Sequence, residues 1–293
     1  MRIKQISDLH TEFREPPFIE NDETDVLILG GDICIADHIH RNPTDDKPGV
    51  IRKDDHIHHA RRYRRLFEQV SSEFNHVIYV MGNHEFYHGD WNTAVDVMRE
   101  ELVKYPNIHL LEKDKVVIDD IVFLGASLWT DMNNEDPLTM INIHREMNDF
   151  KYISNGVINK WDRLRSNHVV ERFKLTLQWL TLILSEDSRK TVVVSHHPPS
   201  RQSITERFRH ALIQNGAFTS NLDQFIADHP QIALWTFGHV HHAHRYYIEN
   251  TLCVANPYGY PGETTGFNSN RIIDLNNMPD KAIVDNDYGW NVK

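Results

Sequence analysis

Short apolar runs, each followed by polar or glycine residues, recur along the chain and predict strands. The clearest is Asp-Val-Leu-Ile-Leu at 25–29, which leads into Gly30. Runs of this kind occupy residues 2–7, 25–29, 76–80, 115–118, 121–124, 191–195, 232–237 and 251–255. Most are apolar throughout rather than alternating, which is typical of strands buried on both faces. The two runs that flank Asp119-Asp120 predict a hairpin.

Between these runs, apolar positions three and four residues apart predict helices. The helical spacing covers residues 55–74, 92–104, 162–185 and 221–228. Strands that alternate with helices indicate a mixed α/β sandwich with the helices outside. Three stretches, 37–54, 130–158 and 257–270, follow neither pattern. Because no repeat or linker divides the chain, we expect one domain over 1–293, with 37–54 as a candidate lid insertion.

Composition and charge narrow the class of protein. The chain has 293 residues and a formal net charge of −11, which disfavours binding to duplex nucleic acid. The cluster Arg61-Arg62-Tyr63-Arg64-Arg65 is the candidate exception. Its helical spacing favours a solvated basic face with Tyr63 turned inward. Oligomeric state is left open.

Cysteine content and the N-terminal sequence point to a cytoplasmic protein. Cys34 and Cys253 are too few and too distant in sequence for a disulfide framework or a CxxC zinc site. The first residues lack the pattern of a signal peptide, and no apolar run is long enough to span a membrane. The unusual number is 20 histidines, because histidine is the commonest metal ligand in proteins.

Five short motifs fall at the ends of predicted strands. They are Asp8-Leu9-His10, Gly30-Gly31-Asp32, Gly82-Asn83-His84-Glu85, Ser195-His196-His197 and Gly238-His239-Val240-His241. Residues two apart on an extended chain point to the same side, so an Asp-x-His or His-x-His pair could reach one metal ion. Ligand crevices form at the carboxyl ends of strands in open α/β sheets. Taken singly, each motif could equally be an ordinary turn or helix cap.

The order of the five motifs resembles the calcineurin-like metallophosphoesterase superfamily, and within it the compact bacterial and phage-type phosphohydrolases. This resemblance implies a four-layer αββα sandwich, in which two mixed β-sheets are flanked by helices. It also implies two divalent metal ions. The implied ligands of the first are Asp8, His10, His241 and a bridging Asp32; those of the second are Asp32, Asn83, His196 and His239.

The metals and the reaction follow from the same resemblance. Nitrogen and oxygen ligands without thiolate suit Mn, Fe, Zn, Ni or Co, and Mn is favoured here. A metal-bridging hydroxide would attack phosphorus, with Asp32 and His84 as the catalytic residues and His84 as proton donor. Glu85 would not bind metal itself but would hydrogen-bond to an imidazole and orient it. For His197 we favour a hydrogen-bonded supporting role over ligation.

One departure from the superfamily pattern narrows the substrate class. Gly31-Asp32 is followed by Ile33-Cys34-Ile35, without the Asp-Arg-Gly of the protein serine/threonine phosphatases. A phosphoprotein phosphatase is therefore disfavoured. The resemblance to the compact phosphohydrolases, which include cyclic-nucleotide-type phosphodiesterases, implies a phosphodiesterase that acts on small nucleotide-like substrates. The alternatives are a phosphomonoesterase or nucleotidase, a nuclease, and a non-catalytic metal-binding scaffold. Residues 256–262 could form one wall of the cleft.

Several aromatic residues near the motifs could stack on a base, or could instead pack in the core. They are Phe86, Tyr87, Trp129, Tyr258 and Tyr260.

Overall fold

The first of two β-sheets is built mainly from the early apolar runs. The computed structural model describes residues 1–39, 55–156 and 162–281. The strands of this sheet, in spatial order, are β11 (Ile272–Asp274), β1 (Arg2–Ile6), β2 (Val26–Leu29), β3 (His76–Tyr79) and β4 (Ile108–Leu110). The pairs β1–β2, β2–β3 and β3–β4 are parallel, and β11 is antiparallel to β1. The sheet is therefore mixed, with its reversed strand at one edge.

The second sheet has the same design. Its strands, in spatial order, are β5 (Asp114–Ile118), β6 (Ile121–Ala126), β7 (Thr191–Ser195), β8 (Ile232–Phe237), β10 (Thr251–Ala255) and β9 (His244–Ile248). The four inner strands run parallel, and β5 and β9 close the edges antiparallel. The predicted hairpin is the β5–β6 pair, whose turn contains Asp119 and Asp120.

The apolar runs fill three cores because each inner strand is buried on both faces. In β2, Val26 and Ile28 pack between the two sheets, and Leu27 and Leu29 pack against the helices below. This alternation follows from the two-residue period of a strand. The second sheet contributes Val192 and Val194 to the core between the sheets. The predicted burial on both faces is confirmed for the inner strands, but it was wrong for the edge strand β5, which is mostly exposed.

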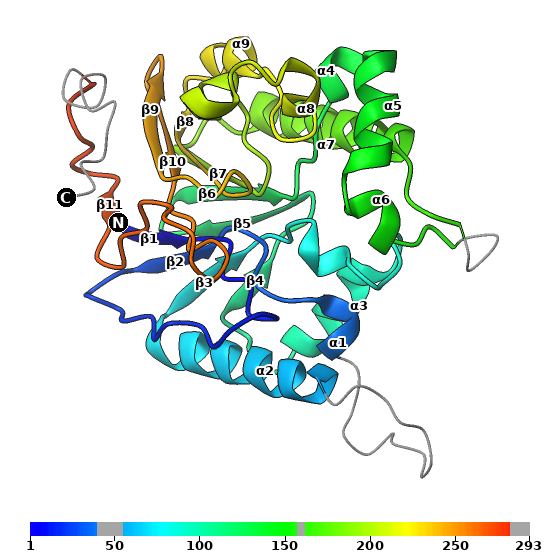
Figure 1. Cartoon of the computed structure of the whole chain (residues 1–293). Helices are drawn as coiled ribbons and strands as arrows, with labels where there is room; N and C mark the ends of the chain where they lie inside the picture. Colours follow the sequence, from blue (N-terminus) through cyan, green and yellow to red (C-terminus); the bar gives the residue numbers. More distant parts are fainter. Residues whose placement is uncertain (40–54, 157–161, 282–293) are drawn as a thin grey trace.

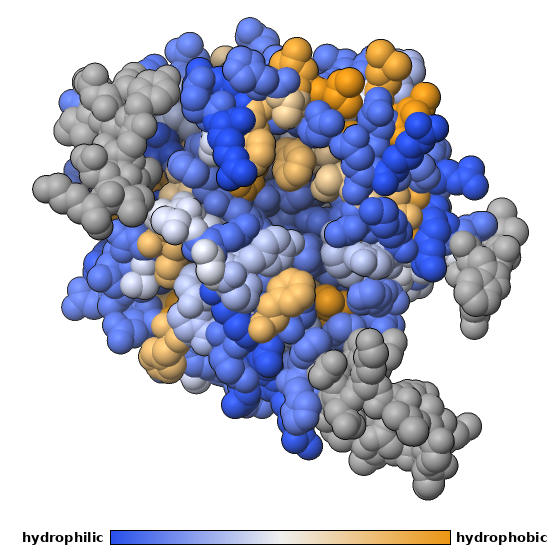
Figure 2. All heavy atoms as spheres, viewed as in Figure 1, coloured by the Kyte–Doolittle hydropathy of each residue, from blue (hydrophilic) through white to orange (hydrophobic). Residues whose placement is uncertain are grey.

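Helices cover the outer faces of both sheets (Figure 1). Below the first sheet lie α1 (Ala36–Ile39), α2 (Asp55–Glu73) and α3 (Ala94–Leu102); above the second lie α7 (Ser166–Glu186) and α9 (Asp223–Ala227). Short helices α4 (Met132–Glu135), α5 (Pro137–Glu146), α6 (Asp149–Tyr152) and α8 (Leu212–Asn215) pack at one side. The architecture is the expected four-layer sandwich, αββα. In the view of Figure 1, the molecular surface has a recess near its middle, bordered mainly by hydrophilic residues (Figure 2).

Several elements differ from the sequence-based expectation. Three strands were not predicted: β4 and β11 are three residues long, and β9 (His-Arg-Tyr-Tyr-Ile) shows no apolar alternation. The region 130–158, predicted irregular, contains three short helices in its described part. Tyr63 is fully buried, which confirms its inward orientation. The lid prediction concerns 37–54, and 40–54 lie outside the described residues. Among the described helices, none is both long and apolar enough to cross a membrane.

Candidate metal centre

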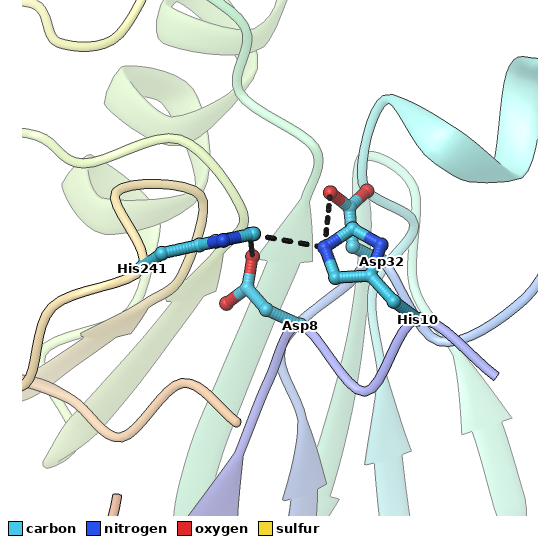
Figure 3. A group of neighbouring side chains, drawn as sticks. All are labelled: Asp8, His10, Asp32 and His241. Atoms are coloured by element: carbon cyan, nitrogen blue, oxygen red, sulfur yellow. Dashed lines mark hydrogen bonds and ion pairs between the residues drawn. The ribbon is translucent and has the colours of Figure 1, made fainter. Parts of the chain in front are cut away.

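The five motifs meet at the carboxyl ends of the central parallel strands. Three groups of side chains in the described part of the chain bring nitrogen and oxygen atoms to within 4.8 Å of one another. One is His10, Glu12 and His84, and the other two share Asp32. Of the two that share Asp32, the first group is Asp8, His10, Asp32 and His241 (Figure 3), and the second is Asp32, His196 and His239. The sheet topology therefore places side chains more than 200 residues apart in sequence at one location.

The local backbone differs from the expectation that paired residues share one side of an extended chain. Asp8, His10, Asp32, His239 and His241 all have positive φ, between 45° and 69°. The extended-chain argument was therefore wrong, although the residues do converge. Left-handed backbone costs a non-glycine residue roughly 1–2 kcal/mol, and such strain persists where surrounding contacts hold it in place. Here the amide of Asp8 donates to the Gly31 carbonyl at 2.9 Å.

The shared carboxylate faces both groups through one oxygen. Oδ2 of Asp32 lies 3.7 Å from His10 Nε2 and 3.4 Å from His196 Nε2. Oδ1 of Asp32 instead accepts a hydrogen bond from the amide of His84 at 2.9 Å. In the first group, Nε2 of His241 lies 2.9 Å from Nε2 of His10 and 3.4 Å from Asp8 Oδ1. A carboxylate in this position could bridge two cations.

Three of the histidines point Nε2 inward because an acceptor holds Nδ1 on the outer side. Nδ1 lies 3.2 Å from Glu12 Oε1 in His10, 2.9 Å from the Gly30 carbonyl in His196, and 2.6 Å from Glu263 Oε2 in His241. Such outer acceptors fix the tautomer and the ring orientation of metal-binding histidines. This arrangement leaves three imidazole nitrogens free to act as ligands in the centre.

Asn83 is oriented in the same way. Its Nδ2 donates to Asp149 Oδ1 at 2.9 Å, and Tyr87 donates to the same oxygen at 2.8 Å. The amide oxygen of Asn83 therefore faces inward, 3.2 Å from His196 Nε2. Asp149 did not stand out in the sequence, because it follows no strand and lies in a region predicted irregular.

Two glycines allow the motif backbones to approach one another. A Cβ atom on Gly82 would collide with the Asp32 carboxylate, and one on Gly31 would collide with the His196 ring. Gly31 also has φ of 87°, which favours glycine. The glycines of the second and third motifs are therefore required by close packing around Asp32.

The donor set fits divalent cations. Asp8 Oδ2 and His239 Nε2 are buried without a hydrogen-bond partner in the described structure, and an unsatisfied buried group of this kind costs about 1–3 kcal/mol. Burial opposes ionisation of Asp8 and Asp32, yet the neighbouring imidazoles prevail and lower both carboxyl pKa values. Burial, followed by nearby His197, lowers the pKa of His239 and favours its neutral, ligating form. A cation would satisfy both unpaired atoms and these carboxylates.

Glu85 has a different task from the expected one of orienting an imidazole. Its carboxylate accepts hydrogen bonds from the amides of Asp32 at 3.0 Å, Ile33 at 2.7 Å and Gly82 at 2.7 Å. Tyr79 donates to it at 2.7 Å. Glu85 therefore ties the turn that carries Asp32 to the turn that carries Asn83. That expectation was wrong because adjacency in sequence to a histidine does not decide where a buried carboxylate points.

Glu12 takes the orienting position instead, and the sequence motifs did not single it out. Its Oε1 lies 2.8 Å from Nδ1 of His84 as well as 3.2 Å from Nδ1 of His10. Burial opposes ionisation of Glu12, but the two histidine hydrogen bonds outweigh it and hold its pKa at about 2. Burial likewise lowers the pKa of His84, while Asp32 and Glu12 raise it more strongly, to about 9. The sequence feature that could have identified Glu12 is its position two residues after His10.

The segment suspected of walling the cleft does reach the centre. Tyr260 places its hydroxyl 3.0 Å from His84 Nε2 and its ring centroid 4.2 Å from that of His10. Three of the aromatic stacking candidates, Phe86, Tyr87 and Trp129, are buried in the core. For those three the packing alternative holds, which leaves Tyr258 and Tyr260 at least partly accessible.

His197 lies beside the candidate ligands His196 and His239. Its Nδ1 lies 3.2 Å from the Ser127 carbonyl, and its ring centroid lies 5.0 Å from that of Trp129 and 4.2 Å from that of His239. Burial and the adjacent His196 lower its pKa to about 3, so the ring is neutral. It packs against the candidate ligand His239, and its supporting role stays a prediction.

Comparison with known proteins places this geometry in a family. A protein from Acanthamoeba polyphaga mimivirus is 24% identical over 238 residues, which cover 76% of this chain and 80% of that protein. The crystal structure of phosphopantetheinyl hydrolase from Mycobacterium tuberculosis superposes with a TM-score of 0.58, at 18% identity, over 88% of this chain and 89% of that one. That likeness shows a shared fold. The calcineurin-like phosphoesterase family matches residues 1–243, and the chain belongs to this family.

Proposed function

We propose that the protein is a two-metal phosphodiesterase for small nucleotide-like esters. The observation that carries the proposal is the Asp32 carboxylate, shared by two groups of inward-facing ligands beside His84. One cation would be held by Asp8, His10, His241 and Asp32, and the other by Asp32, Asn83, His196 and His239. When bound, two such cations lower the pKa of water and offset negative charge on phosphate oxygens. Manganese is the metal favoured for a first test.

The chain itself would supply the proton that the departing group needs. In diester hydrolysis, one water is consumed, one P–O bond breaks, and the leaving oxygen takes up a proton. Glu12 holds the Nδ1 side of His84, so Nε2 is the atom that delivers the proton. Tyr260, whose hydroxyl lies 3.0 Å from that nitrogen, would position it before the substrate arrives.

Charge around the centre favours a diester over a monoester. A diester carries one negative charge, whereas a monoester carries up to two and gains more from a lysine or arginine. Within the described residues, the side chains that form and brace the centre are His, Asp, Asn, Glu and Tyr. The nearby Arg14 lies against the loop of Tyr258 and Gly259 rather than among the ligand groups, because its guanidinium donates to the Gly259 carbonyl at 2.6 Å and lies 3.8 Å from the Tyr258 ring centroid.

The nuclease alternative would rest on the basic cluster of α2, which is partly neutralised by ion pairs. Arg62 and Arg65 both contact Glu15, and Arg64 contacts Glu101 at 2.9 Å. Ion pairs of this kind reduce the charge available to a nucleic-acid backbone. A small substrate therefore remains the better candidate.

Metal removal and substrate choice test the proposal together. The chelated full-length protein should be inactive, and added Mn²⁺ should restore hydrolysis of bis-p-nitrophenyl phosphate in preference to p-nitrophenyl phosphate. Absorbance of released nitrophenolate measures both rates. A preference for the monoester would favour the phosphomonoesterase alternative. Two bound metals with neither ester cleaved would contradict the proposed reaction on these esters and favour the metal-binding scaffold.

Glu12→Gln should lower kcat by roughly 10–100-fold, the range for losing an orienting partner in a metal site. Glutamine keeps the size of the side chain but cannot bind two imidazole N–H groups as an anion. The loss should be larger for alkyl than for nitrophenyl leaving groups, because His84 is affected. Glu15→Gln, an exposed change on the same segment, is the control. Equal losses for both leaving groups would argue for a purely structural role.

A further inference from the structure

One aromatic side chain beside the centre is exposed rather than packed. Phe13 is 58% exposed, yet its ring centroid lies 5.6 Å from that of Tyr260. The same ring lies 6.2 Å from His10 and 6.5 Å from His84, measured between centroids. Leaving a phenylalanine in water forgoes about 1.5–3 kcal/mol of burial. The exposed part of the ring is therefore available to a ligand beside the centre.

The backbone that carries Phe13 is firmly held. The amide of Phe13 donates to the His10 carbonyl at 2.9 Å and closes a tight turn. Both the amide and the hydroxyl of Thr11 donate to the Ile33 carbonyl, and Arg62 donates to the Thr11 carbonyl at 2.5 Å. The exposed ring is thus presented from a fixed turn. A preorganised contact of this kind loses little entropy when a ligand binds.

The neighbouring loop is fixed as well. The Arg14 guanidinium lies 3.8 Å from the centroid of the Tyr258 ring and donates to the Gly259 carbonyl. Glu263 accepts from the amide of Tyr260 at 2.8 Å. The two segments that carry Phe13 and Tyr260 are therefore tied together at the border of the centre.

From this geometry we infer that Phe13 is the stacking platform for the nucleobase of the substrate. The inference rests on the proposed function for the location of the phosphate at the candidate metal centre. The sugar of a nucleotide separates base from phosphate, so a base against Phe13 leaves the phosphate free to reach the histidines. Stacking is tolerant of base identity, because every base has a π face. The site should thus accept purine and pyrimidine esters and disfavour esters without a base.

Binding of uncleavable probes to the manganese-loaded, full-length protein tests this inference. The probes are the 5′-phosphonate analogues of adenosine and of ribose, whose P–C bond resists hydrolysis, and calorimetry measures their affinities. Wild type should bind the adenosine probe more tightly by roughly 5- to 150-fold, the range for one stacked base. Phe13→Ala should abolish the preference, and Phe13→Trp should restore it.

Phe18→Ala is the matched control. Phe18 is 64% exposed and belongs to the same N-terminal segment, but it lines a different hollow with Pro17 and Phe267. Its loss should leave the preference unchanged. Equal affinity of wild type for both probes, or a preference that survives Phe13→Ala, would overturn the inference. The two hypotheses can fail separately, because this experiment measures binding and not hydrolysis. If the protein cleaves neither nitrophenyl ester but shows the Phe13-dependent preference, the base site is supported and only the proposed reaction is contradicted.

Discussion

Asp32→Asn is expected to lose metal and to lower turnover by more than about 100-fold, the upper end of the loss when a residue that only hydrogen-bonds to a metal ligand is changed. The reason is that Oδ2 of Asp32 faces one histidine of each ligand group, His10 in the first and His196 in the second. Asparagine keeps the shape but removes the negative charge that would hold two cations. Asparagine also tolerates the left-handed backbone found at this position, so the variant should fold. Metal content by mass spectrometry, alongside rates on the nitrophenyl diester, measures both effects.

Asp119→Asn provides the control for that experiment. Asp119 is exposed in the β5–β6 turn and has φ of 47°, so the same substitution is made in the same backbone region away from the centre. The control should retain both metals and full turnover. Two metals bound per Asp32→Asn chain, with a rate near that of wild type, would refute the bridging assignment.

His84→Ala is expected to keep its metals and to lose about 10²–10⁴-fold in kcat, the usual contribution of a general acid. The loss should grow as the leaving group becomes poorer, because a good leaving group departs without a proton. A series of nitrophenyl, phenyl and alkyl diesters therefore separates the proton donor from a ligand. Metal content should match wild type, since His84 is outside the two ligand groups that contain Asp32.

The outcome of the His84 series also bears on its neighbours. His84 Nδ1 contacts Glu12, so Glu12→Gln should show a weaker form of the same leaving-group dependence. The double variant should then show the same leaving-group dependence as His84→Ala alone, because the two residues act through one proton. Any added loss through the contact of Glu12 with His10 should be equal for all leaving groups. A steeper leaving-group dependence in the double variant would contradict this coupling.

Much of the fold followed from local patterns. The eight predicted apolar runs all contain observed strands. Most of them are buried on both faces, so their apolar residues alone identify them; β5, which is mostly exposed, is the exception. The strands β9 and β11 were missed because they form by pairing with the edge of a sheet, β9 with β10 and β11 with β1, and their own residues show no strand pattern. Helix ends shifted by a few residues; α7, predicted from 162, begins at Ser166.

The candidate ligands were also named from sequence, yet for a reason that the structure corrects. Motif order selected Asp8, Asp32 and His241, but left-handed turns rather than extended strands bring them together. The ligand assignments and the lid remain predictions. Glu12 and Asp149 lay outside every motif, because a bracing carboxylate is defined by what it contacts.

The sequence by itself determined the family, the strand-end location of the motifs and the set of ligand types. These are properties of residue identity and spacing, which the chain carries before it folds. Only the tertiary structure decided which groups brace the centre and which aromatic ring is exposed. Glu85 points to backbone amides, Glu12 to imidazoles, and Phe13 to solvent. The physical reason is that a side chain's environment is set by segments that approach it from elsewhere in the chain, through contacts that no local pattern encodes.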